Sequence, residues 1–216
     1  DQIQFTSYAR GGTSLASCAD YLEASLTTSL VGIAGVGGFN PIDLGKMLAG
    51  PVANASAYMS SYTHGISGGT TPKDLETALQ LAYLHFTAPN HDAAAFDLLK
   101  RRLEAGIANQ RQNPGSVFGE RVRRVNTSDH CTARATTVEE IQRLNPERMM
   151  AYYKARFSNA ADFTFFFVGA FNVDAITPLL NTYLGSLPST GKKTSKAGDL
   201  HLEFPKMVMR ETVHKG

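Results

Sequence analysis

The fold is decided by residues 145–188, which read NPERMMAYYKARFSNAADFTFFFVGAFNVDAITPLLNTYLGSLP. Asn145 followed by Pro146 is typical of a helix start, because the asparagine caps free backbone N–H groups and proline fits the first helical position. Residues 163–168 form an apolar, aromatic run that predicts a strand buried on both faces. A second helix closes before Pro188. The rest of the chain is expected to supply the layers that cover this strand.

The other predicted elements follow from periodicity, caps and turn residues. The expected strands cover residues 3–8, 53–63, 65–67 and 202–213. The expected helices cover residues 14–31, 41–48, 72–86, 91–112 and 117–125, and a further short helix follows the capping box at 137–140. Strands and helices in this mixed order predict an α+β fold, in which helices pack on one face of an antiparallel sheet.

Composition is that of an ordinary globular protein, with 216 residues, 43% of them hydrophobic, and a formal net charge of +2. The near-neutral charge gives no reason to expect nucleic acid or an anionic membrane as a partner. The basic clusters at residues 100–102 and 121–124 are interpreted as solvated helix faces. No apolar run is long enough to span a bilayer, and residues 1–4 are not typical of a signal peptide.

Domain organisation is predicted from the polar, lysine-rich and glycine-containing stretch near the C-terminal end. Residues 1–188 are expected to form one α+β domain, residues 189–200 a linker, and residues 201–216 the truncated start of a following segment. The abrupt ends of the chain are those expected of a piece cut from a larger protein, to which the function would then belong.

Cys18 and Cys131 are too few for a disulfide framework and lack a Cys-x-x-Cys spacing. A disulfide between them is possible, but our interpretation is two small buried hydrophobic residues. The two cysteines therefore do not indicate whether the chain belongs to an oxidising or a reducing compartment.

Two glycine-containing segments fall short of the motifs that bind phosphates or dinucleotides. Residues 32–38 are glycine-rich but follow a predicted helix, and Asn40 stands where a dinucleotide fingerprint needs its third glycine. Gly45-Lys46 is followed by Met47 and lacks the upstream glycine of a phosphate loop. The glycine-rich segment is therefore interpreted as a turn that ends a helix.

Ser67 lies in Gly65-Ile66-Ser67-Gly68-Gly69, which formally matches the nucleophile elbow of serine hydrolases. That elbow needs a helix directly after the serine, whereas the next predicted helix begins only at Thr71-Pro72. A glycine-rich turn is the preferred interpretation. An independent serine hydrolase using Ser67 is kept as the alternative function.

The six histidines do not form a metal-binding motif, because no two of them lie four residues apart. Each is interpreted as a surface or packed histidine: His64, His85, His91, His130, His201 and His214.

Several strings together resemble the pitrilysin/insulinase-like zinc metallopeptidases, particularly the bacterial two-lobed members. They lie at residues 35–37, 44–46, 64–65, 74–76, 86–89, 152–157, 159, 163–169 and 183–188. The resemblance covers most of the chain through the order and spacing of these strings, and it implies the architecture of a metallopeptidase lobe, similar to that of the mitochondrial processing peptidase.

One departure from this family concerns the zinc motif, which its catalytic domains carry on their first long helix. When Glu23 is matched to the motif glutamate, Asp20 and Ala24 occupy the two histidine positions. Glu104 lies roughly where the distant glutamate ligand would be, but one carboxylate does not hold zinc. The resemblance therefore implies a non-catalytic domain, the first of the C-terminal lobe, with no catalytic, cofactor or metal residues of its own.

The resemblance also implies the remaining expectations about function. The full-length protein would be a zinc-dependent metalloendopeptidase that holds zinc in an N-terminal lobe of the same polypeptide. The present domain would be inactive alone and would wall the chamber around a peptide substrate. A scaffold domain without peptide contact is a further alternative. A bacterial periplasm or cell envelope is the compartment that the resemblance suggests.

Overall fold

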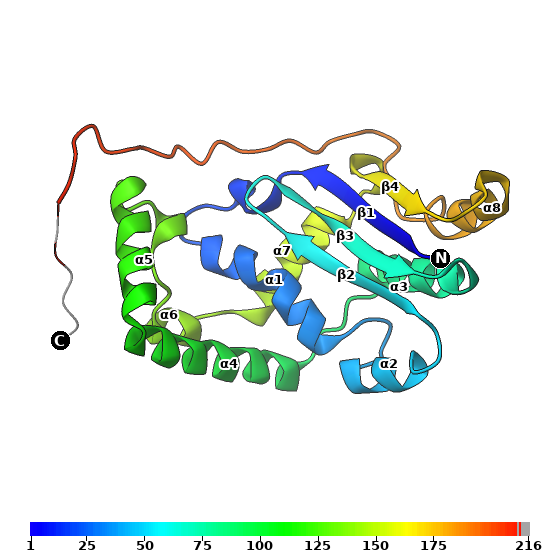
Figure 1. The fold of residues 1–216 in the computed structure, drawn as a ribbon, viewed down its shortest axis with the longest axis horizontal. Coiled ribbons are helices and arrows are strands. Elements are labelled where there is room, and N and C mark those ends of the chain that lie inside the picture. The colour runs from blue at the N-terminus through cyan, green and yellow to red at the C-terminus, as the bar shows by residue number, and fades with distance from the viewer. Residues whose placement is uncertain (211, 213–216) are drawn as a thin grey trace.

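The structure is a computed structural model that describes residues 1–210 and 212. Within these residues, one antiparallel sheet of order β2-β3-β1-β4 packs against a layer of helices, which confirms the predicted α+β fold (Figure 1). The strands are β1 (Ile3–Arg10), β2 (Ala53–Met59), β3 (Thr63–Thr70) and β4 (Thr164–Gly169).

Asparagine, threonine and proline signals at residues 40–41, 137 and 145–146 predicted three of the helix starts, but not those of all the helices. The helices are α1 (Tyr21–Ala34), α2 (Pro41–Met47), α3 (Leu75–Thr87), α4 (Ala93–Gln112), α5 (Pro114–Asn126), α6 (Val138–Gln142), α7 (Pro146–Phe157) and α8 (Val173–Tyr183). The side chains of Asn40 and Asn145 accept hydrogen bonds from backbone N–H groups in the first turns of α2 and α7. Thr137 and Glu140 form the expected capping box of α6.

The first long helix was predicted over residues 14–31, but α1 begins at Tyr21. Residues 12–15 instead form a short 3₁₀ turn, and Ser17 and Asp20 bond to each other in the bend that follows. At the other end Gly35 has φ +83°, and a Cβ there would lie 2.1 Å from the Phe39 carbonyl oxygen. Only glycine suits that position, so the glycine-rich segment ends the helix as predicted.

β4 was predicted to be buried on both faces, and this is wrong. The strand lies at the edge of the sheet, and helices cover one face only, so alternate side chains point away from them (Figure 1). Phe166 and Val168 are 47% and 71% exposed, whereas Phe163 is buried. The apolar run therefore contributes one face to the core and leaves the other open.

The strand predicted over residues 202–213 is absent from residues 202–210 and 212, and residues 211 and 213 lie outside the described residues. The chain after α8 instead runs without a strand from the α8 end of the molecule to the α5 end, where residues 202–210 lie (Figure 1). The preceding stretch, predicted as a linker, is fixed to the domain because Asp162 accepts the backbone N–H groups of Thr194 and Ser195.

The core is centred on α7, which packs against α1. Tyr153 and Phe157 are 0% and 1% exposed, and their rings stack 4.4 Å apart. Phe157 also contacts the rings of Phe86, His64 and Phe163. One aromatic cluster thus joins α7 to α3 and to the sheet.

Candidate functional site

Glu23, matched above to the glutamate of the zinc motif, has a structural role. Its side chain is buried, and Oε1 accepts hydrogen bonds from the Arg148 Nη2 at 2.7 Å and from the Asn145 backbone N–H at 2.9 Å. The carboxylate therefore ties α1 to the start of α7 across 125 positions of sequence. A charge-assisted contact of this kind fixes the carboxylate in place.

The two positions matched to histidine ligands do not complete a metal site. Asp20 accepts a hydrogen bond from the Ser17 hydroxyl at 2.6 Å, and Ala24 has no ligand atom. Within residues 1–210 and 212, Glu23 and Glu104 belong to no group of three potential metal ligands. The residues present at this position therefore do not fit zinc.

Replacing Glu23 by alanine is expected to lower the free energy of unfolding by about 2 kcal/mol, because the partly buried Asn145 N–H and the Arg148 guanidinium would lose their shared acceptor. Urea unfolding would measure the loss. Arg148→Ala and the double variant complete a thermodynamic cycle, in which the two losses should add to more than the loss in the double variant. Strict additivity would contradict a coupled contact.

Ser67 lies within β3, between Thr6 of β1 and Ser56 of β2. Its side chain is exposed on the sheet face that the helices leave open, and three more strand residues follow it. His64 lies three residues before Ser67 on the same strand, so its side chain points to the opposite face of the sheet, where it is buried beneath the helices. The structure thus provides neither the strand-to-helix turn nor the base that a serine nucleophile needs.

His64 and His85 are packed inside the domain, in agreement with the sequence interpretation. The Nδ1 of His64 accepts the Gly12 N–H at 3.2 Å, and its Nε2 lies 2.9 Å from the Arg156 carbonyl oxygen. The Nε2 of His85 lies 3.1 Å from the Ala55 carbonyl oxygen. Each ring joins a strand or its flanking turn to another part of the core.

His64 is expected to make the domain sensitive to acid. Burial lowers the pKa of its imidazole from 6.5 to about 4, against a smaller opposing effect of the bond to the Arg156 carbonyl. Between these values the unfolded chain holds a proton on this ring that the folded chain does not, so stability falls as pH falls through the window. The loss reaches at most about 3 kcal/mol, since one pKa unit corresponds to about 1.4 kcal/mol.

Urea unfolding at about pH 7 and about pH 4.5 would measure this effect. The His64→Gln variant should lose less stability between the two conditions than the parent chain, and His201→Gln, which removes an exposed histidine, is the matched control. A residual slope is expected in His64→Gln because burial also lowers the pKa of His85. Equal slopes in the parent and His64→Gln would contradict the prediction.

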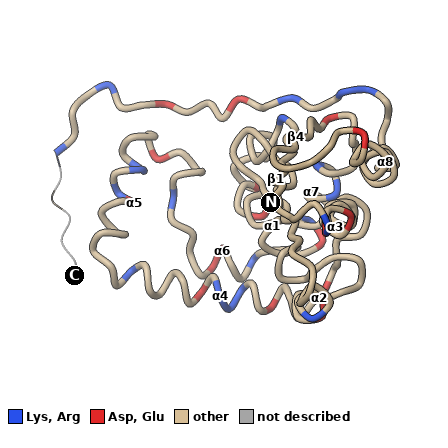
Figure 2. Tube along the Cα trace, turned by 45° about the vertical axis from the view of Figure 1, so that its right-hand side comes forward, with Lys and Arg blue, Asp and Glu red and all other residues tan. Residues whose placement is uncertain are grey.

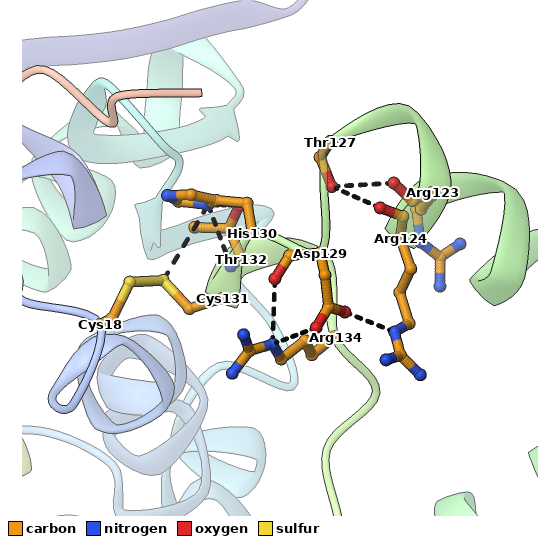
Figure 3. Close-up of polar contacts among 9 residues, drawn as sticks. All are labelled: Cys18, Arg123, Arg124, Thr127, Asp129, His130, Cys131, Thr132 and Arg134. Atoms are coloured by element: carbon orange, nitrogen blue, oxygen red, sulfur yellow. Dashed lines mark hydrogen bonds and ion pairs between the residues drawn. A yellow bond between two sulfur atoms is a disulfide. The ribbon is translucent and has the colours of Figure 1, made fainter. Parts of the chain in front are cut away.

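Cys18 and Cys131 form a disulfide, so the interpretation of two separate buried hydrophobic residues is wrong (Figure 3). Their Cα atoms lie 5.7 Å apart although 113 positions separate them in sequence. The bond joins the turn before α1 to a 3₁₀ turn after α5. His130 lies beside them, with Nδ1 4.0 Å from the Cys131 sulfur, but the disulfide uses both sulfurs and leaves no thiolate for a metal.

The open face of the sheet carries an apolar patch that the sequence did not reveal. It consists of Tyr8 from β1 with Phe166 and Val168 from β4, all exposed. The Tyr8 and Phe166 rings stack 5.9 Å apart with nearly parallel planes. No described helix covers this face (Figure 1). We call these residues the open-face patch.

Three comparisons with known proteins agree with this geometry. Residues 143–213 match the family model described as the peptidase M16 inactive domain. The chain is 27% identical over 191 residues to an Arabidopsis thaliana protein described as a zinc protease PQQL-like, covering 87% of this chain and 17% of that protein.

Two solved structures share the fold. The periplasmic protease PqqL from Escherichia coli superimposes with a TM-score of 0.81 at 19% identity, over 100% of this chain and 23% of that one. A peptidase M16 inactive domain from Pseudomonas fluorescens gives a TM-score of 0.71 at 19% identity, over 89% of this chain and 48% of that one. The chain thus spans about a fifth of the length of the two larger relatives. Residues 143–213 thus resemble the inactive domain of M16 peptidases, and the chain as a whole shares its fold with solved proteins of that kind.

Proposed function

We propose that this domain forms part of the wall of the substrate chamber in a larger zinc-dependent metalloendopeptidase. The observation that carries the proposal is the role of Glu23, whose carboxylate is bonded to Arg148 and to the Asn145 backbone. The two positions matched to the histidine ligands hold Asp20 and Ala24 instead. Zinc and the chemistry of hydrolysis would then come from an N-terminal lobe of the same polypeptide. The description of the Arabidopsis relative as a zinc protease supports this division.

The open-face patch is the surface that we assign to peptide contact. Exposed apolar side chains that adjoin one another on a folded domain mark surfaces that bind other chains. The patch lies beside the outer edge of β4, whose partner within the described residues is β1 alone. An extended peptide could add to that edge through backbone hydrogen bonds and place alternate side chains on Phe166 and Val168.

A bacterial periplasm or cell envelope is the compartment that we propose. The Cys18–Cys131 disulfide supports it, because such bonds persist in oxidising compartments and are rare in the cytosol. The fold similarity to a periplasmic protease points the same way. Within residues 1–210 and 212, every helix is too short or too polar to cross a lipid bilayer.

Photo-cross-linking in the complete polypeptide that carries this chain tests the proposed wall. A photoreactive phenylalanine analogue would replace Phe166, and a labelled peptide substrate would be added before illumination. The matched control places the same analogue at Ile42, which is 72% exposed on α2, away from the open face. Label is expected at position 166 and not at 42.

The outcomes also separate the alternatives. Equal labelling at both positions, or none at 166 while the peptide is being hydrolysed, would exclude a peptide-contacting wall and favour a scaffold domain. Labelling of Ser67 by a fluorophosphonate in the isolated chain would instead support the serine hydrolase alternative.

A further inference from the structure

A cavity of about 550 Å³ lies between the C-terminal part of α4, the helix α5 and the segment that leads into α6. Its basic lining residues are Arg111, Arg123, Arg124 and Arg134. We call this cavity the arginine groove. Figure 2 shows basic residues on α5 and on the facing segment before α6. The two clusters at residues 100–102 and 121–124 therefore differ, because the second contributes to this cavity and the first does not.

Two of the four guanidinium groups are held in place by Asp129 (Figure 3). The Arg124 Nε donates to Asp129 Oδ1 at 2.6 Å, and the Arg134 Nε donates to the Asp129 carbonyl oxygen at 3.0 Å. Ser128 and Asp129 have φ +49° and +59°, a conformation that few non-glycine residues adopt. The turn thus places Asp129 between two arginines and fixes their positions before any ligand arrives.

The charge balance of the groove is positive. Four arginines face two lining glutamates, Glu120 and Glu140. Glu140 is already bonded to the Thr137 backbone N–H at 2.8 Å in the capping box. Guanidinium groups bind carboxylates through paired, charge-assisted hydrogen bonds, so the groove suits a ligand that carries several carboxylates.

We propose that the arginine groove binds an acidic segment of the polypeptide substrate. Arg111 and Arg123 would bind the carboxylates, while Asp129 keeps Arg124 and Arg134 in position. The size of the cavity suits a few amino-acid side chains. Nucleic acid is disfavoured, because no aromatic residue of the described part of the chain lines the groove to stack a base, and the chain as a whole carries only +2.

The disulfide adds to this arrangement. Cys131 lies two positions after Asp129, and its bond to Cys18 fixes the turn that carries Asp129 to the start of α1. Loss of the disulfide would free that turn and weaken the preorganisation of Arg124 and Arg134. Binding of an acidic peptide is therefore expected to be tighter in the oxidised chain than in the reduced chain.

Fluorescence anisotropy with a fluorescein-labelled hexaglutamate peptide tests the proposal. The dissociation constant is expected to rise about tenfold in the variant Arg111→Gln/Arg123→Gln, since each lost arginine removes charge-assisted hydrogen bonds. The control variant is Arg101→Gln/Arg102→Gln, which removes the same charge from exposed positions of α4 outside the groove. It should bind nearly as tightly as the parent chain.

Four results would overturn the proposal. The first two are a control variant that binds the peptide as weakly as Arg111→Gln/Arg123→Gln, and a hexaglutamine peptide that binds as tightly as hexaglutamate. The other two are a single-stranded oligonucleotide that displaces the peptide at a lower concentration than unlabelled hexaglutamate does, and dimerisation of the chain that depends on these arginines. The inference rests on the proposed function only in taking the acidic segment to be part of a peptidase substrate. A failed anisotropy test would leave the cross-linking result at Phe166 intact, and a failed cross-link would leave the anisotropy result intact.

Discussion

Replacing Phe157 by alanine is expected to lower the free energy of unfolding by about 4 kcal/mol, the range typical of a buried phenylalanine truncated in a core. The ring is 1% exposed and contacts Tyr153, Phe86, His64 and Phe163, so its removal leaves a cavity where α7, α3 and the sheet meet. Collapse of that cavity would require several rings to move together.

Urea unfolding followed by circular dichroism would measure the loss. Phe118→Ala is the matched control, because Phe118 is 60% exposed on α5, and its truncation should change stability by less than about 0.5 kcal/mol. A loss below about 1 kcal/mol for Phe157→Ala would contradict a core centred on α7.

Removing the disulfide with Cys18→Ser/Cys131→Ser is expected to cost about 4 kcal/mol, because the bond closes a long loop and so restricts the unfolded chain. The closed loop spans 113 positions and includes the helices α1 to α5 and the strands β2 and β3. The measurement is the urea midpoint of the oxidised parent chain against that of the variant.

A reductant provides the control for this prediction. It should lower the midpoint of the parent chain to that of the double variant and leave the variant unchanged. A parent chain that keeps its midpoint after full reduction would show that the bond adds no stability and that the turn after α5 is held by other contacts.

Local signals in the sequence predicted the starts of α2, α6 and α7. Asn40, Asn145 and the Thr137–Glu140 box act through atoms within four residues, so their effect does not depend on the rest of the fold. The exposure of β4 was not predictable in this way. An apolar run shows that a strand has partners, but whether one or both faces are covered depends on layers that come from elsewhere in the chain.

In the candidate site, too, the features within one helix could be predicted from the sequence, whereas contacts between distant residues could not. The absence of zinc ligands near Glu23 is visible in the sequence, because the motif lies within one helix. The partner that holds Glu23, Arg148, is distant in sequence, and so are the two halves of the disulfide. The arginine groove also joins segments that no short-range pattern connects, and the basic cluster at residues 121–124 was interpreted from the sequence as a solvated helix face.

The zinc content of the purified, oxidised chain is the most direct test of an inactive domain. Elemental mass spectrometry after dialysis without chelator is expected to find far less than one zinc per chain, because Glu23 is held by Arg148 and, among residues 1–210 and 212, belongs to no group of three potential ligands. A tightly held, stoichiometric zinc that is lost on Glu23→Gln substitution would contradict this account and place the chemistry in this domain.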